Sequence, residues 1–284
     1  MWAALTVSAF VAVGAAGGSA QAPVRPPSAP RAPVAASPET SSAPTNKSPA
    51  RPPKARAAPL VPAPHPLMTE VLFAVPTGEK GDANGDGTRE VSGDEFIELV
   101  NPHEEPIDLG GYRLADRSMG TKDAMGFVFP ACTLEPGQVV VVFNGHKSTF
   151  DGPVGDARRA PSLPHERFHK ALVFSMNNTK SRIGLANGGD LVALVAPGGE
   201  VVEVVRWGQF DEKPPAAPLM EEAPASARGS VTRQTLDGPF VSHDALGVPF
   251  SPGEFPPIAG SPPPPTTPAS ATPTSPAKPP SKPK

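Results

Sequence analysis

The chain has 284 residues, of which 25 are Lys or Arg and 28 are Asp or Glu, so its formal net charge is −3 at pH 7. Its single cysteine, Cys132, excludes a disulfide framework and a lipid-attachment cysteine near the start. Cys132 lies in the apolar passage FPACTLEPG, where we expect it to pack as a small buried hydrophobe.

The chain starts with an apolar run, MWAALTVSAFVAVGAAGGSA, that ends in small residues. Gly18 and Ala20 stand where a signal peptidase cuts, so residues 1–20 are interpreted as a secretory signal peptide. The usual basic residues before the apolar run are missing, and an uncleaved membrane anchor is the alternative. The run is short for a spanning helix of about 20 residues, which favours cleavage and a mature chain without a membrane span. The predicted location is therefore secreted, extracellular or cell-surface, with the periplasm included.

Proline and charge separate two flanks from the centre of the chain. Residues 1–66 hold 14 of the 42 prolines and residues 256–284 hold 12. Because such segments bury too little surface to offset the entropy of ordering, residues 21–66 and 256–284 are predicted to be disordered Pro-rich arms. The two flanks hold nine basic residues and one acidic residue, so the centre has 16 basic and 27 acidic residues and a net charge of −11.

These charges bear on the partner. An acidic central domain argues against nucleic acid. Basic arms suit an anionic envelope polymer such as wall glycan or lipopolysaccharide, and a merely solubilising spacer is the alternative.

An acidic, glycine-rich stretch, GDANGDGTREVSGDEF, follows the first predicted strand. Its oxygen-bearing side chains recur at alternating positions, and its glycines let the backbone turn sharply. Calcium takes six to eight oxygen ligands, which a loop of this kind supplies. The sequence therefore predicts a structural calcium site, in which Thr88 would offer its carbonyl and Glu90 would act through water. The candidate ligands are Asp82, Asn84, Asp86, Thr88, Glu90 and Asp94.

This stretch differs from an EF-hand loop. Its twelfth position is Gly93, where an EF-hand has a bidentate Glu, and Asp94 comes one residue later. Segments that read as β, rather than amphipathic helices, flank it on both sides. An ordinary solvated turn is the alternative to a calcium site, because Asn, Asp and Gly tolerate left-handed conformations.

Short apolar segments separated by Gly, Pro, Asn and Asp fill residues 67–255, and no helical period of useful length lies between them. This pattern predicts an all-β antiparallel sandwich or barrel. The predicted strands are Met68 to Val75, Glu95 to Asn101, Tyr112 to Ala115, Phe127 to Phe129, Val139 to Phe143, Ala171 to Phe174, Ser181 to Leu185, Leu191 to Val195, Val201 to Trp207 and Ser230 to Arg233.

Several connections have turn signatures. The segment PIDLGG at 106–111 is predicted to carry the chain from one sheet to the other, and VVVVF at 139–143 to be a strand buried on both faces. The segments Asn187 to Asp190 and Pro197 to Glu200 are predicted hairpin turns, which would produce a three-strand meander ending at Trp207.

Two stretches, Asn144 to Lys170 and Gly208 to Gly229, are long for connections in a compact sandwich, and loops of this length are usually functional or mobile. The first contains PHERFHK, in which His165 and His169 stand four residues apart. On a helix these two histidines would share a face and could hold zinc. The order is not H-E-x-x-H and no third ligand is evident, so the preferred interpretation is a solvated turn.

Six segments in the same order resemble a bacterial lamin tail domain across most of residues 67–255. They are TEVLFAVPTGEKGDANGDG, DEFIELVN, PIDLGGYRLAD, FVFPACTLEPGQVVVVFNG, GDLVALVAPGGEVVEVVRWG and SVTRQTLDGPFVSHDALGVPFSPGEF. The resemblance implies an immunoglobulin-like antiparallel β-sandwich, found in nuclear lamins and in secreted and surface proteins of bacteria, where it is sometimes joined to hydrolases. It implies attachment rather than catalysis. The long stretch at 144–170 and the one after Phe210 depart from the family pattern.

No catalytic constellation stands out, because there is no G-x-S-x-G elbow and the Gly-rich turns lack the context that cradles phosphate. The sequence therefore predicts a non-catalytic secreted or cell-surface module for adhesion, scaffolding or envelope attachment. Its expected partner is an envelope polymer or another surface protein, and nothing indicates an oligomeric state. The alternative is an extracellular metal-dependent hydrolase, of nuclease or phosphoesterase type, centred on the acidic loop and His103.

Overall fold

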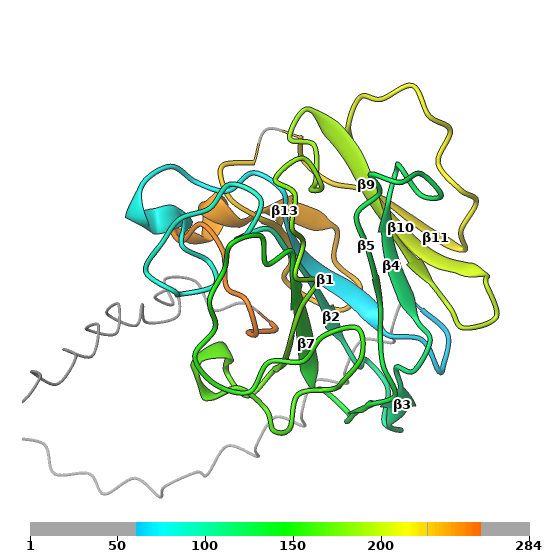
Figure 1. Cartoon of the computed structure of the whole chain (residues 1–284). Helices are drawn as coiled ribbons and strands as arrows, with labels where there is room; N and C mark the ends of the chain where they lie inside the picture. The colour runs from blue at the N-terminus through cyan, green and yellow to red at the C-terminus, as the bar shows by residue number, and fades with distance from the viewer. Residues whose placement is uncertain (1–60, 226, 257–284) are drawn as a thin grey trace, which may run out of the picture. The chain divides into compact units, whose positions relative to one another are not determined.

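A computed structural model describes residues 61–225 and 227–256 of the chain. The predicted signal peptide, most of the leading arm and nearly all of the tail lie outside these residues. The described part consists of two facing β-sheets with a short two-stranded ribbon at one end (Figure 1). This arrangement confirms the all-β sandwich that the apolar pattern predicts.

The first sheet has six strands in the order β13-β12-β1-β2-β7-β8. Its strands are β1 (Leu67–Leu72), β2 (Phe96–Val100), β7 (Val139–Phe143), β8 (Leu172–Ser175), β12 (Val231–Arg233) and β13 (Phe240–Ser242). All neighbours are antiparallel except β7 and β8, which run parallel.

The second sheet has five strands in the order β11-β10-β9-β4-β5, and β3 pairs with β6 in the ribbon. The strands are β3 (Ile107–Asp108), β4 (Arg113–Asp116), β5 (Gly126–Val128), β6 (Thr133–Leu134), β9 (Gly189–Val195), β10 (Val201–Gly208) and β11 (Leu219–Glu222). Three short 3-10 helices complete the described part: η1 (Glu79–Gly81), η2 (Glu166–Phe168) and η3 (His243–Leu246).

The two parallel pairs lie at sheet edges and explain the two long stretches. Parallel neighbours need a long crossover, whereas antiparallel neighbours need only a tight turn. The stretch at 144–170 returns the chain to start β8 beside β7, and the stretch at 208–229 contains β11, which lies parallel to β10. The sandwich is therefore antiparallel in its centre and parallel at one edge of each sheet.

Aromatic side chains join the two sheets. Phe73, just after β1, stacks on Trp207 of β10 with ring centroids 4.2 Å apart and an interplanar angle of 6°. Phe174 of β8 meets the edges of Phe127 and Phe129, each at 5.5 Å. Stacked and edge-to-face aromatic pairs add about 0.5–1.5 kcal/mol each beyond the area they bury.

The strand β7 is buried along its whole length, as VVVVF predicts. One reason is the stretch at 144–170, whose Phe150 and Phe168 lie 5.5 and 5.4 Å from Phe143 between ring centroids. This stretch therefore packs against the sandwich and extends its core.

A buried ion pair also connects the sheets. The guanidinium of Arg233 on β12 donates from Nη2 to Glu203 Oε1 on β10 at 3.0 Å, and both side chains are 0% exposed. The other carboxylate oxygen of Glu203 accepts the backbone N–H of Met68 on β1 at 2.8 Å. One carboxylate thus holds two strands of the opposite sheet.

Two of the predicted turns differ in outcome. The turn at Pro197–Glu200 is confirmed: it joins β9 to β10, Ala196 N donates to Glu200 O at 2.8 Å, and Gly199 has φ 94°. The predicted strand Ser181–Leu185 is wrong, because this segment forms turns and bends. The hairpin at Asn187–Asp190 is therefore wrong as well, and the neighbour of β9 on that side is β4.

The start of the folded region lies earlier than residue 67. Val61 is buried, and His65 shares a 2.7 Å hydrogen bond with the hydroxyl of Tyr112. Residues 61–66, predicted as linker, therefore pack against the sandwich. Cys132 is a half-buried free thiol against the core, and burial raises its pKa to about 11.

Candidate functional site

The acidic loop connects β1 to β2 and folds inward. Asp82, Asn84 and Asp94 are buried, and Asp86 is half-buried. These four of the six predicted ligands are brought together by hydrogen bonds within the loop. The loop predicted to hold the site is thus compact in the structure.

The side chains of Asp82 and Asn84 converge on one backbone group. The N–H of Asp86 is shared by Asp82 Oδ1 at 3.1 Å and Asn84 Oδ1 at 2.9 Å. The second oxygen of Asp82 accepts the N–H of Gly87 at 2.8 Å. Two of the predicted oxygen ligands therefore already point to the same side of the turn.

Asp94 closes the loop from its other end. Its two oxygens accept the backbone N–H groups of Asn84 at 3.0 Å and Glu90 at 2.7 Å. Burial raises the pKa of Asp94 to about 7, the neighbouring charges of Asp82 and Asp86 add to the rise, and the two hydrogen bonds oppose it. Three carboxyl groups thus lie close enough to repel one another.

Thr88 and Glu90 do not contact the other candidate ligands through the oxygens that the prediction assigned to them. Thr88 is exposed and Glu90 half-buried, and the contacts they make with the other candidate ligands come from their backbone N–H groups. Within residues 61–225 and 227–256, no three His, Cys, Asp or Glu side chains form a group that could hold a metal ion. A cation in this loop would have to draw the carboxylates closer and use Asn84 or backbone carbonyls as well.

The stretch at 144–170 covers the acidic loop. Thr149 donates its backbone N–H to Asp86 Oδ2 at 2.8 Å, and Asn84 Nδ2 donates to the hydroxyl of Ser148 at 2.9 Å. Arg167 donates from Nη1 to the carbonyl of Gly85 at 2.6 Å. The site is therefore built from two segments that are remote in sequence.

Gly93 explains why the loop lacks the EF-hand glutamate. A Cβ at Gly93 would lie 2.3 Å from the carbonyl oxygen of His146, so no larger residue fits where the two segments meet. The position that carries a bidentate ligand in an EF-hand is used here for close backbone packing.

Charge in the loop is not balanced by ion pairs. Among the residues that the structure describes, Asp82, Asp86 and Asp94 form no salt bridge with Lys, Arg or His. Arg167 contacts the loop, but it donates to the carbonyl oxygens of Asn84 and Gly85 rather than to the carboxylates. The carboxylate oxygens accept hydrogen bonds from backbone N–H groups instead.

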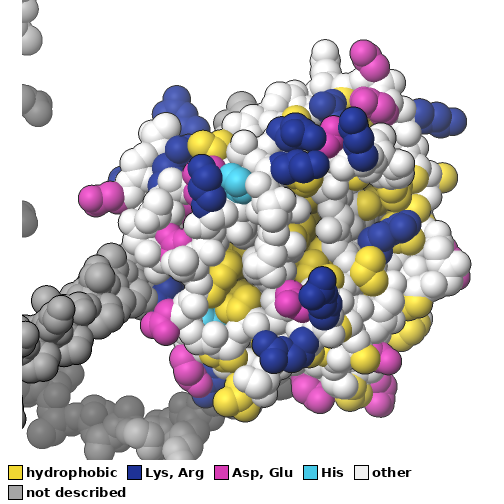
Figure 2. Space-filling view, in the orientation of Figure 1, with side chains coloured by type: hydrophobic (Ala, Val, Ile, Leu, Met, Phe, Trp, Pro, Cys, Tyr) yellow, Lys and Arg dark blue, Asp and Glu magenta, His cyan; other side chains and the backbone are white. Residues whose placement is uncertain are grey.

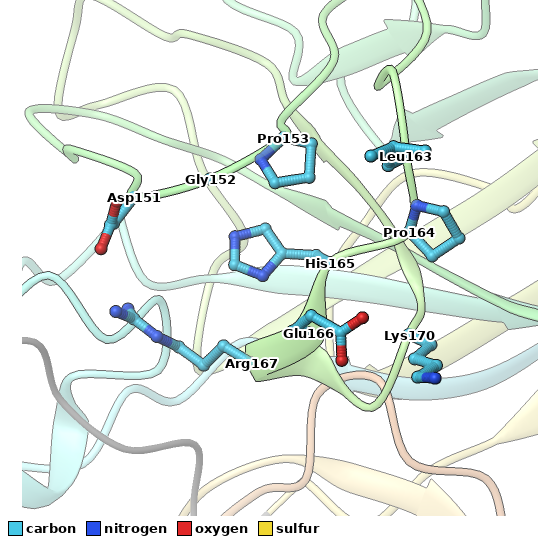
Figure 3. Close-up of a pocket in the computed structure, with 9 residues that line it drawn as sticks. All are labelled: Asp151, Gly152, Pro153, Leu163, Pro164, His165, Glu166, Arg167 and Lys170. Carbon is cyan, nitrogen blue, oxygen red and sulfur yellow. The ribbon is translucent and has the colours of Figure 1, made fainter.

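His165 belongs to a pocket beside this loop rather than to a metal centre. Figure 3 shows its imidazole between Asp151, Gly152 and Pro153 on one side and Glu166 and Arg167 on another. Both ring nitrogens are buried, and burial lowers the pKa of the ring. A Cβ at Gly152 would lie 2.8 Å from Nε2, so the ring is enclosed by packing.

The predicted solvated turn at PHERFHK is therefore only partly right. His165 is buried, η2 follows it, and His169 ends η2 in a left-handed conformation with φ 50°. The segment is one 3-10 turn, too short to present His165 and His169 as successive residues on one face of an α-helix.

His103 is remote from the acidic loop. It follows the C-terminal end of β2, whereas Asp94 precedes the N-terminal end of the same strand. Its Nε2 contacts the carbonyl of His65 at 2.9 Å, and its backbone N–H donates to Asn101 Oδ1. A strand of five residues spans roughly 17 Å, so the centre that combines His103 with the acidic loop is wrong.

A buried polar network was not predicted from the sequence. Glu70 accepts hydrogen bonds from the hydroxyl and backbone N–H groups of Ser251 at 3.0 Å each and from the Ser230 hydroxyl at 2.6 Å. His243 Nε2 lies 2.8 Å from the Ser251 hydroxyl. Charged residues inside otherwise apolar strands are the only sequence signal of such a network.

This network resembles a nucleophile, base and acid only in composition. His243 Nδ1 contacts the carbonyl of Val248 at 3.0 Å, where a catalytic histidine would contact a carboxylate. Ser251 is buried, as are Glu70 and His243. The network fastens the segment after η3 to β1, and Glu98 does the same on β2 by accepting the N–H of Gly253 at 2.7 Å.

The model of one protein family, the Lamin Tail Domain, matches residues 77–209, a region that contains the acidic loop and strands β2 to β10. No curated protein matches the chain. The match supports a lamin tail domain in this protein, and the two facing sheets agree with its immunoglobulin-like β-sandwich. No helix in the described residues combines the length and apolar character needed to cross a membrane.

Proposed function

We propose that this protein is a non-catalytic module that uses its lamin tail domain for adhesion, scaffolding or envelope attachment outside the cytoplasm. The observation that carries the proposal is the match of residues 77–209 to the lamin tail domain within an immunoglobulin-like sandwich. In this proposal the sandwich is a structural unit, and its surface and the flanking arms make the contacts.

The proposed partner is an anionic envelope polymer, and another surface protein is the second choice. Support comes from the apolar start of the chain and from the six Lys and Arg residues of the leading flank, against the single acidic residue Glu39. Basic segments bind polyanions through electrostatic attraction that weakens with salt.

Cosedimentation of the full mature chain with purified wall glycan or lipopolysaccharide tests this proposal. We expect binding that weakens between about 50 and 200 mM salt, because the Debye length shortens over this range. A variant with Arg25, Arg31, Lys47, Arg51 and Lys54 changed to Gln should bind weakly, while its melting curve stays unchanged. Equal binding by the variant and the parent would contradict a role for the basic arm.

The acidic loop is proposed to hold a structural calcium ion. Support comes from the side-chain oxygens of Asp82 and Asn84, which converge on the backbone N–H of Asp86. Further support comes from the lack of salt bridges to the loop carboxylates among the described residues and from the raised pKa of Asp94. Bound calcium would stabilise the three carboxylates in their ionised form and join the loop to the stretch at 144–170.

Excess calcium should raise the melting temperature of the full chain relative to chelator. A site at a hundred times its Kd adds about 2.7 kcal/mol, which for a domain of this size corresponds to about 5–10 °C. Asp82→Ala should abolish the shift and leave the sandwich folded, whereas Asp211→Ala, at an exposed carboxylate, should retain it. Equal melting temperatures of the parent protein in calcium and in chelator would contradict the calcium site and favour an ordinary turn.

The alternative of a metal-dependent hydrolase has no observation in its favour. Its proposed centre combined His103 with the acidic loop, and β2 separates the two. We therefore propose only the structural role for the loop.

A further inference from the structure

The segment between β10 and β11 packs against the outer face of the five-stranded sheet through Phe210 and Ala217. It forms a second small core, separate from the one between the sheets. This core consists of Leu191, Ala193, Val195 and Val204 on the strands, with Val201, Phe210 and Ala217 packed against them. This segment thereby places Phe210 beside Arg117, just after β4, and Arg206 on β10.

Two arginines converge on Phe210. The guanidinium of Arg117, just after β4, lies 5.8 Å from the ring centroid, and that of Arg206 on β10 lies 5.5 Å from it. Each cation over an aromatic ring gains roughly 0.5–1 kcal/mol, but two like charges at one ring repel each other. An anion beside Arg206 would reduce that repulsion.

Arg206 lacks an anionic partner. Its guanidinium makes no salt bridge or hydrogen bond within the described residues, and its Nε is buried without an acceptor. Arg117 differs, since its guanidinium lies 3.8 Å from both Asp190 and Glu212. A buried guanidinium N–H without an acceptor is costly, so Arg206 is the group that a ligand would satisfy.

Arg206 opens into two adjoining cavities. One, of about 600 Å³, is lined by Arg117, Arg206, Gln209, Phe210, Asp211 and Glu212. The other, of about 650 Å³, shares Arg206 and Gln209 and reaches Glu222 on β11. Figure 2 shows that Lys, Arg, Asp and Glu side chains are interspersed on the face in view. Arg117 and Arg206 are both half-buried and line the first cavity together with Asp211 and Glu212, so a ligand can reach them in a setting of mixed charge.

We propose that Arg206, with Arg117, Phe210 and Gln209, forms a binding site for a singly charged carboxylate group. The planar guanidinium presents paired N–H donors that match the two oxygens of a carboxylate, and Phe210 holds the guanidinium in place. Asp211, Glu212 and Glu222 at the rim disfavour a dianion such as phosphate. This site lies outside the acidic loop, and it extends the proposed function by assigning a ligand class to one surface of the sandwich.

The test follows the Nε–Hε resonance of Arg206 by nuclear magnetic resonance in the full chain. The resonance is identified by its loss in Arg206→Lys. Sodium acetate replaces chloride at constant ionic strength, and sodium phosphate at pH 8 is the second probe. We expect a saturable shift of this resonance with acetate and a weaker response with phosphate.

Three variants sharpen the test. Arg117→Gln should weaken acetate binding about tenfold, because one charge-assisted contact is lost, and Glu222→Gln should strengthen it by removing a competing carboxylate. Arg158→Gln makes the same change of charge in the stretch at 144–170 and should leave acetate binding unchanged. Melting curves of each variant establish that it is folded.

A linear shift common to all arginines, or an Arg206 response unchanged in Arg117→Gln, would overturn the site. A stronger response to phosphate than to acetate would overturn the ligand class. None of these outcomes depends on calcium or on the basic arm, so this proposal and the proposed function can fail separately.

Discussion

Replacement of Arg233 by Met is expected to destabilise the protein by about 3–5 kcal/mol, because it leaves the charge of Glu203 buried and unpaired. For a domain of this size the melting temperature, measured by calorimetry, should fall by about 6–20 °C. Arg233 also donates to the carbonyls of Met68 and Gly238, which would lose their partner. The pair spans the two sheets, so its loss weakens the contact that defines the sandwich.

The destabilisation should depend on pH. Burial raises the pKa of Glu203 to about 7 even beside Arg233, and removal of Arg233 takes away the charge that opposes this rise. Glu203 in the variant should therefore take up a proton, and the variant should lose less stability at pH 5 than at pH 8.

Two further variants separate charge from packing. Adding Glu203→Gln to Arg233→Met should recover part of the loss, since the amide oxygen still accepts the N–H of Met68 without a buried charge. Arg182→Met breaks an ion pair of similar length, 2.8 Å to Asp123, with side chains 60% and 37% exposed. This control should cost less than about 1 kcal/mol. Equal losses of stability in Arg182→Met and Arg233→Met would contradict the role given to the buried pair of Arg233 and Glu203.

The second large effect is expected from pH alone: in the presence of chelator, the protein should be more stable near pH 5 than near pH 8. Burial raises the pKa of Asp116 to about 6 and of Asp94 to about 7, and it raises the pKa values of Glu70, Glu95 and Glu98. In the unfolded chain these groups ionise near pH 4. Between about pH 4 and the raised pKa values, the folded state binds more protons than the unfolded state, so the free energy of unfolding falls as pH rises.

Two histidines act in the opposite direction. Burial lowers the pKa values of His65 and His165, so their contribution to stability is lost as pH falls below about 6.5. The carboxyl groups with raised pKa values outnumber these two histidines. The free energy of unfolding should therefore fall on balance between pH 5 and pH 8. Calorimetry at pH 5, 6, 7 and 8 measures this slope.

Glu98→Gln isolates one of these groups. Glu98 accepts hydrogen bonds from the Thr69 hydroxyl and the Gly253 N–H, both at 2.7 Å, and lies beside the carboxyl of Glu70. An amide avoids the cost of a buried charge. The free energy of unfolding of the variant should therefore depend less on pH than that of the parent protein, and it should fall less between pH 5 and pH 8. A stability that rises from pH 5 to pH 8 in the parent protein would be the opposite result.

Local patterns predicted several elements well. The run VVVVF is β7 at Val139–Phe143, the segment Pro197–Glu200 is the β9–β10 turn, and PIDLGG lies where the chain passes from the first sheet to the second. Each of these depends on neighbouring residues alone: apolar continuity, a glycine with positive φ, or a bend with Pro and Gly. Ser181–Leu185 failed because it has the length of a strand but no neighbour to pair with in the sandwich.

The acidic loop shows the same division between local and distant information. Alternating Asp and Asn among glycines indicates a tight turn with inward oxygens, and Asp82, Asn84 and Asp86 lie in one, because Asx side chains bond to backbone groups two to five residues away. The contacts of Ser148, Thr149 and Arg167 with this loop come from residues more than 60 positions away, which no local pattern encodes.

Sequence alone determined that the protein has a β-rich acidic centre between basic Pro-rich flanks, because composition and period are properties of neighbouring residues. Tertiary structure decided which charges are buried. Glu70, Glu98, Glu203 and Arg233 look like ordinary solvent-facing residues within strands, and only the meeting of distant strands removes them from water. It also decided that the two long stretches pack against the sandwich, since that depends on which apolar faces remain uncovered once the sheets have formed.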